Sequence, residues 1–100
     1  MLTDESFSLE IRYCVSWNYK PKAASLAEKL KEEYECEVTI IPGKRGEFSI
    51  WIYDTKSDDK EGLFIIGKEG FDFPSHNRVI AATDKIIEQM IWRNHSLMHI

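Results

Sequence analysis

Hydrophobic and polar residues alternate strictly near the start of the chain. From Phe7 to Tyr13 every second residue is apolar, and Ser8, Glu10 and Arg12 occupy the positions between them. A period of two places all the apolar side chains on one face of a strand. The pattern predicts a first strand that buries one face.

A helical period follows this strand. Apolar residues recur at spacings of three and four from Ala23 to Tyr34, and charged residues occupy the other side. This pattern is typical of an amphipathic helix. Pro21 suits a first helical turn, because the N–H that it lacks would be unpaired there in any case. We therefore expect the helix to begin close to residues 18–21.

Three more strands and a second helix complete the pattern. Apolar or β-branched runs bounded by turn residues cover residues 37–41, 48–53 and 63–66. Apolar residues then return at helical spacing from Val79 to Ile91, where Ser75 or Asn77 is available as a cap. The predicted order of elements is β-α-β-β-β-α.

This order predicts how the elements pack. Strands joined through a helix lie parallel and strands joined by short turns lie antiparallel, so the four-stranded sheet is mixed. A first strand with a single apolar face favours both helices on the same face of the sheet. We expect an α/β fold, a two-layer sandwich that forms one domain over residues 1–100, with a core at about residues 7–92 and a flexible tail over 93–100.

Charge and hydropathy exclude several classes of function. The net charge is −4, and the longest basic step is Lys44-Arg45, which argues against nucleic-acid binding. No apolar run approaches the roughly 20 residues that span a bilayer, and the acidic N-terminus lacks the pattern of a signal peptide. We expect a cytoplasmic protein that binds neither nucleic acid nor membrane.

The cysteines and histidines form no metal motif. The spacing of Cys14 and Cys36 matches no zinc site. His95 and His99 lie four residues apart near the C-terminus, but no third ligand accompanies them. The chain is therefore expected to hold no metal ion.

Short motifs along the chain resemble those of a known family. In order, they are Tyr13-Cys14, Tyr19-Lys20-Pro21-Lys22, Ile41-Pro42-Gly43, Gly46-x-Phe48 and Gly70-x-x-Phe73-Pro74. Their order and spacing resemble the selenoprotein W and Rdx family, thioredoxin-like proteins whose first strand runs into a Cys-x-x-Cys or Cys-x-x-selenocysteine turn. The last motif carries one residue more than the family's usual Gly-x-Phe-Pro. The resemblance implies a thioredoxin-like fold and a role in thiol redox biology.

The chain departs from that family at position 17, where Trp17 stands in place of the second cysteine or selenocysteine. A Cys-x-x-Cys pair cycles between a disulfide and two thiols, and tryptophan has no sulfur for that cycle. Cys36 does not replace it, because the predicted parallel strands put it about 20 Å from Cys14. A disulfide needs Cα atoms within about 7 Å. We expect no dithiol oxidoreductase activity from this degenerate motif.

Two functions stay open. The resemblance implies that Cys14 is at most a monothiol, which would form a mixed disulfide with glutathione or with a partner protein. The residues that would shape and charge its surroundings are Trp17, Tyr19, Lys20 and Lys22. No other cofactor is expected.

The alternative is a non-catalytic module that binds a protein partner. It would use the loop of residues 15–20 together with an aromatic sheet face. Trp51 and Tyr53 alternate with the apolar residues of the third strand and so point to the opposite side from them. Exposed aromatic side chains often mark binding surfaces.

Overall fold

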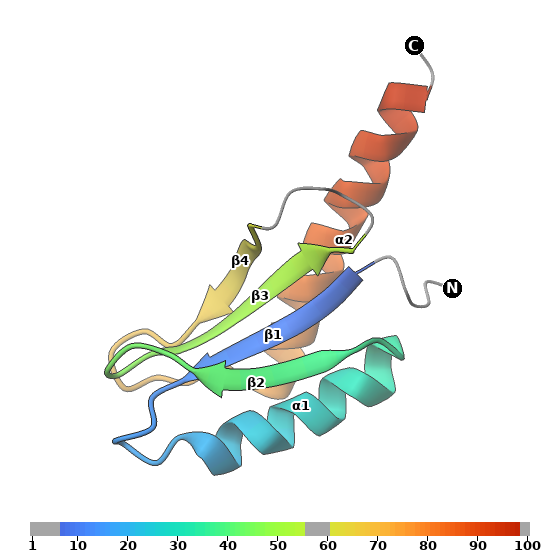
Figure 1. Cartoon of the computed structure of the whole chain (residues 1–100). Helices are drawn as coiled ribbons and strands as arrows, with labels where there is room; N and C mark the ends of the chain where they lie inside the picture. Colours follow the sequence, from blue (N-terminus) through green and yellow to red (C-terminus); the bar gives the residue numbers. More distant parts are fainter. Residues whose placement is uncertain (1–6, 56–60, 99–100) are drawn as a thin grey trace.

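The structure, a computed structural model, describes residues 7–55 and 61–98. Its elements follow the predicted order (Figure 1). They are β1 (Phe7–Tyr13), α1 (Lys20–Tyr34), β2 (Val38–Pro42), β3 (Phe48–Asp54), β4 (Leu63–Gly67) and α2 (His76–Met98). All six predicted elements are present, and the predicted strand limits agree with the observed ones to within a residue.

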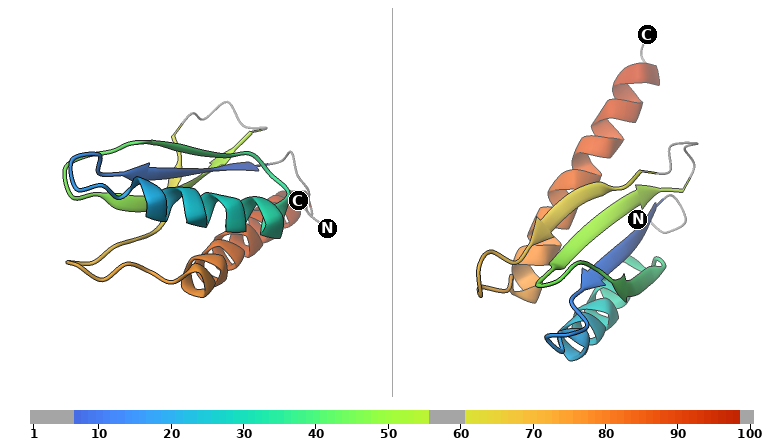
Figure 2. Two further views of the ribbon diagram at one scale, coloured as in Figure 1. Left: turned by 90° about the horizontal axis from the view of Figure 1, so that it is seen from below. Right: turned by 60° about the vertical axis from the view of Figure 1, so that its left-hand side comes forward.

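The four strands form one mixed sheet in the order β2-β1-β3-β4. Strand β1 is parallel to β2 and antiparallel to β3, and β3 is antiparallel to β4. Both helices cover the same face of the sheet, which leaves the other face open (Figure 2). The predicted two-layer α/β sandwich with a thioredoxin-like arrangement is confirmed.

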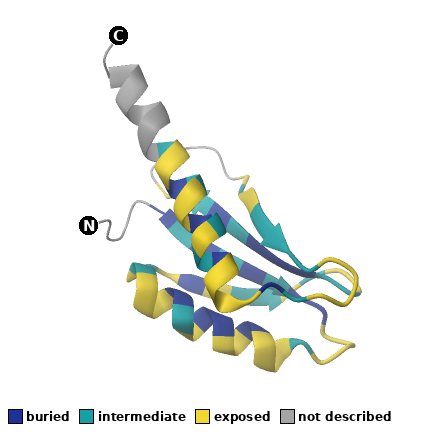
Figure 3. Ribbon diagram, turned by 180° about the vertical axis from the view of Figure 1, so that it is seen from behind, coloured by how far each residue is buried: buried dark blue, intermediate teal, exposed yellow. Residues whose placement is uncertain are grey.

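The core lies between the sheet and the two helices (Figure 3). Leu9 and Ile11 of β1 are buried with Ile50 and Ile52 of β3, their partners across the antiparallel ladder. The helices contribute Ala23, Leu26, Leu30, Val79 and Ile87. The period of two in β1 therefore predicted the buried face correctly.

Local sequence explains where the helices begin. Pro21 lies in the first turn of α1, as predicted. Ser75 caps α2, because its Oγ accepts a hydrogen bond from the backbone N–H of Arg78 at 3.2 Å. Helix α2 extends to Met98, so the predicted tail begins in helix, and its flexibility stays a prediction.

Tyr34 joins the two helices. Its hydroxyl donates to the backbone carbonyl of Ile80 at 3.1 Å and contacts the carboxylate of Asp84 at 2.5 Å. Burial and the neighbouring carboxylate raise the pKa of Tyr34 well above its ordinary value.

Over the residues that the structure describes, neither helix has the length and hydropathy needed to cross a membrane.

Candidate functional site

Cys14 lies in the loop that leaves the C-terminal end of β1. The loop closes as a tight turn, in which Tyr19 donates a backbone hydrogen bond to Cys14 at 3.3 Å and Asn18 has a positive φ of 60°. The turn between β2 and β3 lies beside it, because β1 and β2 are parallel and end at the same edge. The backbone N–H of Gly43 donates to the carbonyl of Tyr13 at 2.8 Å.

The sulfur of Cys14 is surrounded by hydrogen-bond donors. It lies 3.5 Å from the hydroxyl oxygen of Ser16. Burial raises the pKa of the thiol, but hydrogen bonds from the Ser16 hydroxyl and from the backbone N–H groups of Gly46, Trp17 and Ser16 outweigh it. The pKa of Cys14 is therefore lower than its ordinary value. Donors that favour the charged form make a thiol more nucleophilic near neutral pH.

A surface hollow of about 580 Å³ lies over this thiol. Its lining residues are Cys14, Val15, Ser16, Trp17, Gly43 and Arg45. Cys14 itself is only 1% exposed, so it forms the floor of the hollow. Residues 15–18 are all exposed and belong to neither helix nor strand. A disulfide can therefore reach the sulfur only when this loop shifts.

Trp17 forms one wall of the hollow and remains 43% exposed. Its ring covers Gly46, whose φ is +77°, and a Cβ atom added at Gly46 would lie 3.2 Å from that ring. A glycine is needed here both for the backbone conformation and for the close approach of the indole. Trp17 thus packs the Cys14 loop against the β2–β3 turn.

Tyr19, Lys20 and Lys22 lie away from the thiol. The Tyr19 ring contacts Phe73 edge-on at 4.8 Å, and the ammonium of Lys22 lies 4.6 Å from the same Phe73 ring. Lys22 lines a separate cavity of about 460 Å³. Lys20 is exposed and lines neither hollow. The side chains that line the hollow with Cys14 include those of Ser16, Trp17 and Arg45, and neither lysine is among them.

Sequence reasoning missed Ser16, Gly46 and Arg45 as neighbours of the thiol. The predicted parallel pairing of β1 and β2 could have identified Arg45 and Gly46, because it brings the turn after β2 to the end of β1. Side-chain patterns carry no information on the backbone N–H of Gly46. Its role therefore follows only from the three-dimensional arrangement.

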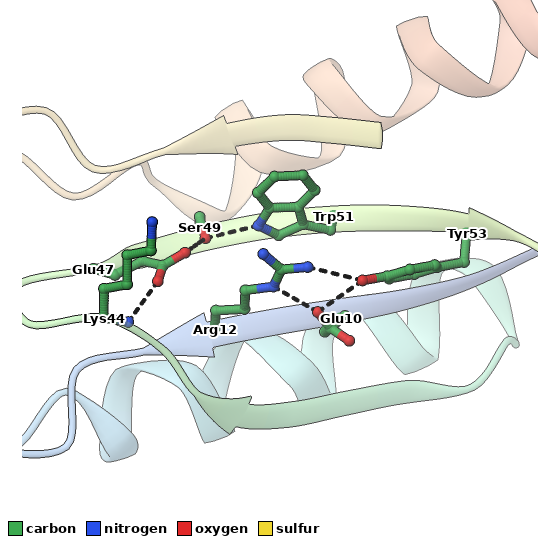
Figure 4. Close-up of polar contacts among 7 residues, drawn as sticks. All are labelled: Glu10, Arg12, Lys44, Glu47, Ser49, Trp51 and Tyr53. Carbon is green, nitrogen blue, oxygen red and sulfur yellow. Dashed lines mark hydrogen bonds and ion pairs between the residues drawn. The ribbon is translucent and has the colours of Figure 1, made fainter. Parts of the chain in front are cut away.

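Trp51 and Tyr53 point to the open face of the sheet, on the side opposite to the buried apolar residues of β3 (Figure 4). The guanidinium of Arg12 lies 4.0 Å above the Trp51 ring and donates to the Tyr53 hydroxyl at 2.9 Å. Glu10 accepts from Arg12 at 2.7 Å and from Tyr53 at 3.0 Å. The two aromatic residues are half-buried, and their neighbours hold them in place.

Glu47 connects this network to the turn beside Cys14 (Figure 4). Trp51 donates from Nε1 to the Ser49 hydroxyl at 2.8 Å, and Ser49 donates to Glu47 at 2.5 Å. The second oxygen of Glu47 accepts from the backbone N–H of Lys44 at 2.7 Å. Burial raises the pKa of Glu47, yet these hydrogen bonds and nearby cations bring it below its ordinary value. Glu47 therefore stays charged and fixes the turn.

The described residues contain no group of three or more metal-ligating side chains. Neither cysteine, both within the described chain, forms a disulfide. Leu9 pairs with Val38 and Tyr13 with Pro42, so Cys36 lies near the start of β1 and Cys14 beyond its end. His99 and the side chain of His95 lie outside the described part.

Comparison with known proteins gives the family. The model of the Rdx family matches residues 8–96. The chain belongs to the Rdx family. This membership supports a redox-related role for a thioredoxin-like protein. Two statements stay predictions, namely that Trp17 replaces the second cysteine of the family's motif and that the protein is cytoplasmic.

Two solved structures show the same fold as this Rdx protein. A selenoprotein W-related protein from Vibrio cholerae is 24% identical, with a TM-score of 0.64 over 83% of this chain and 99% of that chain. A protein from Bordetella parapertussis is 21% identical, with a TM-score of 0.64 over 81% of this chain and 98% of that chain. No curated protein matches the sequence.

Proposed function

We propose that this Rdx protein acts as a monothiol through Cys14, which forms a mixed disulfide with glutathione or with a partner protein. The observation that carries the proposal is the set of donors around the sulfur, namely the Ser16 hydroxyl and the backbone N–H groups of Ser16, Trp17 and Gly46. Because they lower the pKa of the thiol, a larger share of it is thiolate at neutral pH.

The exchange with oxidised glutathione needs only one protein sulfur. The Cys14 thiolate attacks one sulfur of the glutathione disulfide, and a new S–S bond forms as the old one breaks. One glutathione leaves as a thiolate. Cys14 is thereby oxidised and the leaving glutathione is reduced. Cys36 lies too far away to resolve the product, so a second thiol from solution has to release Cys14.

Oxidised glutathione tests the proposal directly. We expect incubation of the chain with this disulfide to add a glutathionyl group to Cys14, found by peptide mass spectrometry and removed by a reductant. Cys36 is the internal control, and Cys14→Ser should lose the main adduct. An unmodified Cys14 under conditions that modify Cys36 would overturn the proposal.

A non-catalytic binding module is the second candidate, and it is favoured by the near-complete burial of Cys14 in a hollow that the exposed Trp17 also lines. Here the loop of residues 15–20 would contact a protein, and the thiol would be only a small residue at a strand end. In affinity capture, Trp17→Ala should then lose partners that Cys14→Ser retains. The monothiol function gives the opposite result, because captured partners would depend on the sulfur.

A further inference from the structure

Three segments meet at the end of the molecule where Cys14 lies, and we call them together the thiol end: residues 14–22, 43–47 and 68–75. They are at one end of the sheet in the views of Figure 1 and Figure 3. Trp17 covers Gly46 of the second segment. The ammonium of Lys68, in the third, lies 5.7 Å from the rings of Trp17 and Tyr19.

The thiol end is basic although the chain is acidic. It holds five cations, Lys20, Lys22, Lys44, Arg45 and Lys68. Its three carboxylates are Glu47, Glu69 and Asp72. The net charge of the chain is −4, so the remaining surface is more acidic than the whole. Glu47 is also engaged with Ser49 and the backbone of Lys44, which leaves two carboxylates to face a ligand.

Exposed apolar side chains lie among these cations. Val15 is 59% exposed and Phe71 is 87% exposed, and Trp17 stands between the hollow and solvent. Lys68 lies 6.0 Å from the Phe71 ring, so it is placed between that ring and Trp17. Contiguous exposed apolar side chains bordered by charge are typical of a surface that binds another protein segment.

The open face of the sheet is less suited than the thiol end to bind a protein segment. Trp51 and Tyr53 use their polar atoms on Ser49, Arg12 and Glu10. These polar atoms are already paired within the chain, so a partner gains no new hydrogen bond there without breaking one of them. The exposed apolar ring beside them is Phe64, which lies edge-on to Trp51 at 5.5 Å. At the thiol end the exposed Phe71 ring has no polar atom of its own, and Lys68 beside it donates from Nζ to the carbonyl of Gly70 at 2.7 Å.

We propose that the thiol end is the docking surface for an acidic, cysteine-bearing segment of a partner protein. Carboxylates of that segment contact Lys44, Arg45 and Lys68. Its cysteine is held in a disulfide, and an apolar side chain next to that cysteine packs on Trp17 and Phe71. Charges more than about 8 Å apart are largely screened at physiological ionic strength. The segment therefore senses the local positive excess rather than the net charge of the chain.

This inference rests on the monothiol function only for the identity of the reacting group. The docking itself can be measured without sulfur chemistry. Cys14→Ser is titrated with two labelled peptides that share an apolar residue beside serine, one flanked by aspartates and the other by lysines, and fluorescence anisotropy reports binding. We expect about tenfold tighter binding of the acidic peptide at low salt, and a smaller difference as salt is added.

Charge reversals locate the surface. Arg45→Glu and Lys68→Glu should each remove most of the preference for the acidic peptide. Lys85→Glu makes the same change in net charge on exposed α2, outside the thiol end, and should leave the preference intact. Phe71→Ser should weaken binding without changing its salt dependence, because it removes apolar contact and no charge.

A covalent arm separates this inference from the proposed function. Wild type is mixed with matching cysteine peptides, each carried as a mixed disulfide with glutathione. Equal affinities and equal exchange rates for the two charges would overturn the docking surface while Cys14 remains a reactive thiol. An acidic preference in Cys14→Ser without any adduct in wild type would support docking and contradict the monothiol function. A single-stranded oligonucleotide that competes as well as the acidic peptide would show general anion binding and would overturn the proposal.

Discussion

At the residue scale, the hydrogen bonds that lower the pKa of the Cys14 thiol come from the Ser16 hydroxyl and from backbone N–H groups, and no lysine side chain is among them. Gly46 supplies one of the donated N–H groups. That group is held in place by the turn 44–47, in which Glu47 accepts from Lys44 and Ser49. We therefore expect Glu47 to act as a positioning residue for the thiol without touching the sulfur.

Removal of Glu47 should make the thiol less acidic. We expect Glu47→Ala to raise the pKa of Cys14 by several tenths, because the turn loses the carboxylate that orients Gly46. The pH dependence of Cys14 alkylation measures this shift. Glu47→Gln, which keeps one acceptor oxygen, should give an intermediate value.

The sign of the shift is diagnostic. Loss of a nearby negative charge alone would lower the pKa of a thiol, because it removes repulsion of the thiolate. Glu69→Ala removes an exposed carboxylate at the same end of the molecule and serves as the control for this electrostatic effect. If Glu47→Ala lowered the pKa as the control does, Glu47 would have no positioning role.

The sequence predicts the positions of some of these side chains but not their contacts. Alternation in β3 separated Trp51 and Tyr53 from the apolar residues of that strand, and the structure places the two on the face away from the helices. The alternation could not foretell that Arg12 and Glu10 half-bury them, because cross-strand register decides which side chains meet. The prediction has Lys22 lending charge to the surroundings of the thiol, whereas in the structure its ammonium lies over the Phe73 ring.

At the scale of elements, the Cys14 loop depends on the β2–β3 turn against which it packs. Two glycines with positive φ allow a matched comparison. Gly46, at +77°, lies under the Trp17 ring, whereas Gly70, at +62°, would place a Cβ atom in open space. Both should resist substitution because of backbone strain, but only Gly46 also positions an indole.

We expect Gly46→Ala and Gly70→Ala each to lower the free energy of unfolding by about 1 kcal/mol, because alanine is strained at positive φ. Urea unfolding measures this loss. Gly46→Ala should in addition displace Trp17 and speed the alkylation of Cys14 at a pH where the thiol is fully ionised. Equal alkylation rates in the two variants would show that Trp17 does not screen the sulfur.

The contact between the helices depends on the Tyr34 hydroxyl. We expect Tyr34→Phe to lower the free energy of unfolding by about 1 kcal/mol at neutral pH, since the hydrogen bonds to Ile80 and Asp84 are lost. The pKa of Tyr34 is higher in the folded chain than in the unfolded one. Its stabilisation is therefore complete below the unfolded pKa of about 10 and declines as the pH rises above it.

Urea unfolding across that pH range gives the check. Wild type should lose stability above about pH 10 more steeply than Tyr34→Phe. Parallel curves for the two chains would mean that the hydroxyl has no special partner in the folded state. Asp84→Ala should reproduce part of the loss at neutral pH, because it removes one of the two acceptors.

At the scale of the whole molecule, the fold could be predicted from sequence because its signals are periodic. The alternation in β1, the helical spacing after Pro21 and the short turns after β2 and β3 together predict the two-layer sandwich. The candidate site could be predicted only in part. Its position after β1 follows from the family resemblance, whereas the basic thiol end arises from three segments that only the fold brings together.

Folding lowers the pKa of Cys14 through the hydrogen bonds to its sulfur. This effect is tested most directly in Cys36→Ser, which leaves one thiol, by the rate of alkylation as a function of pH in the native chain and in the same chain unfolded in urea. We predict a midpoint for the native thiol below that of the unfolded thiol, whose ordinary pKa is about 8.5. A native midpoint equal to or above the unfolded one would show that the hydrogen bonds around the sulfur do not lower its pKa.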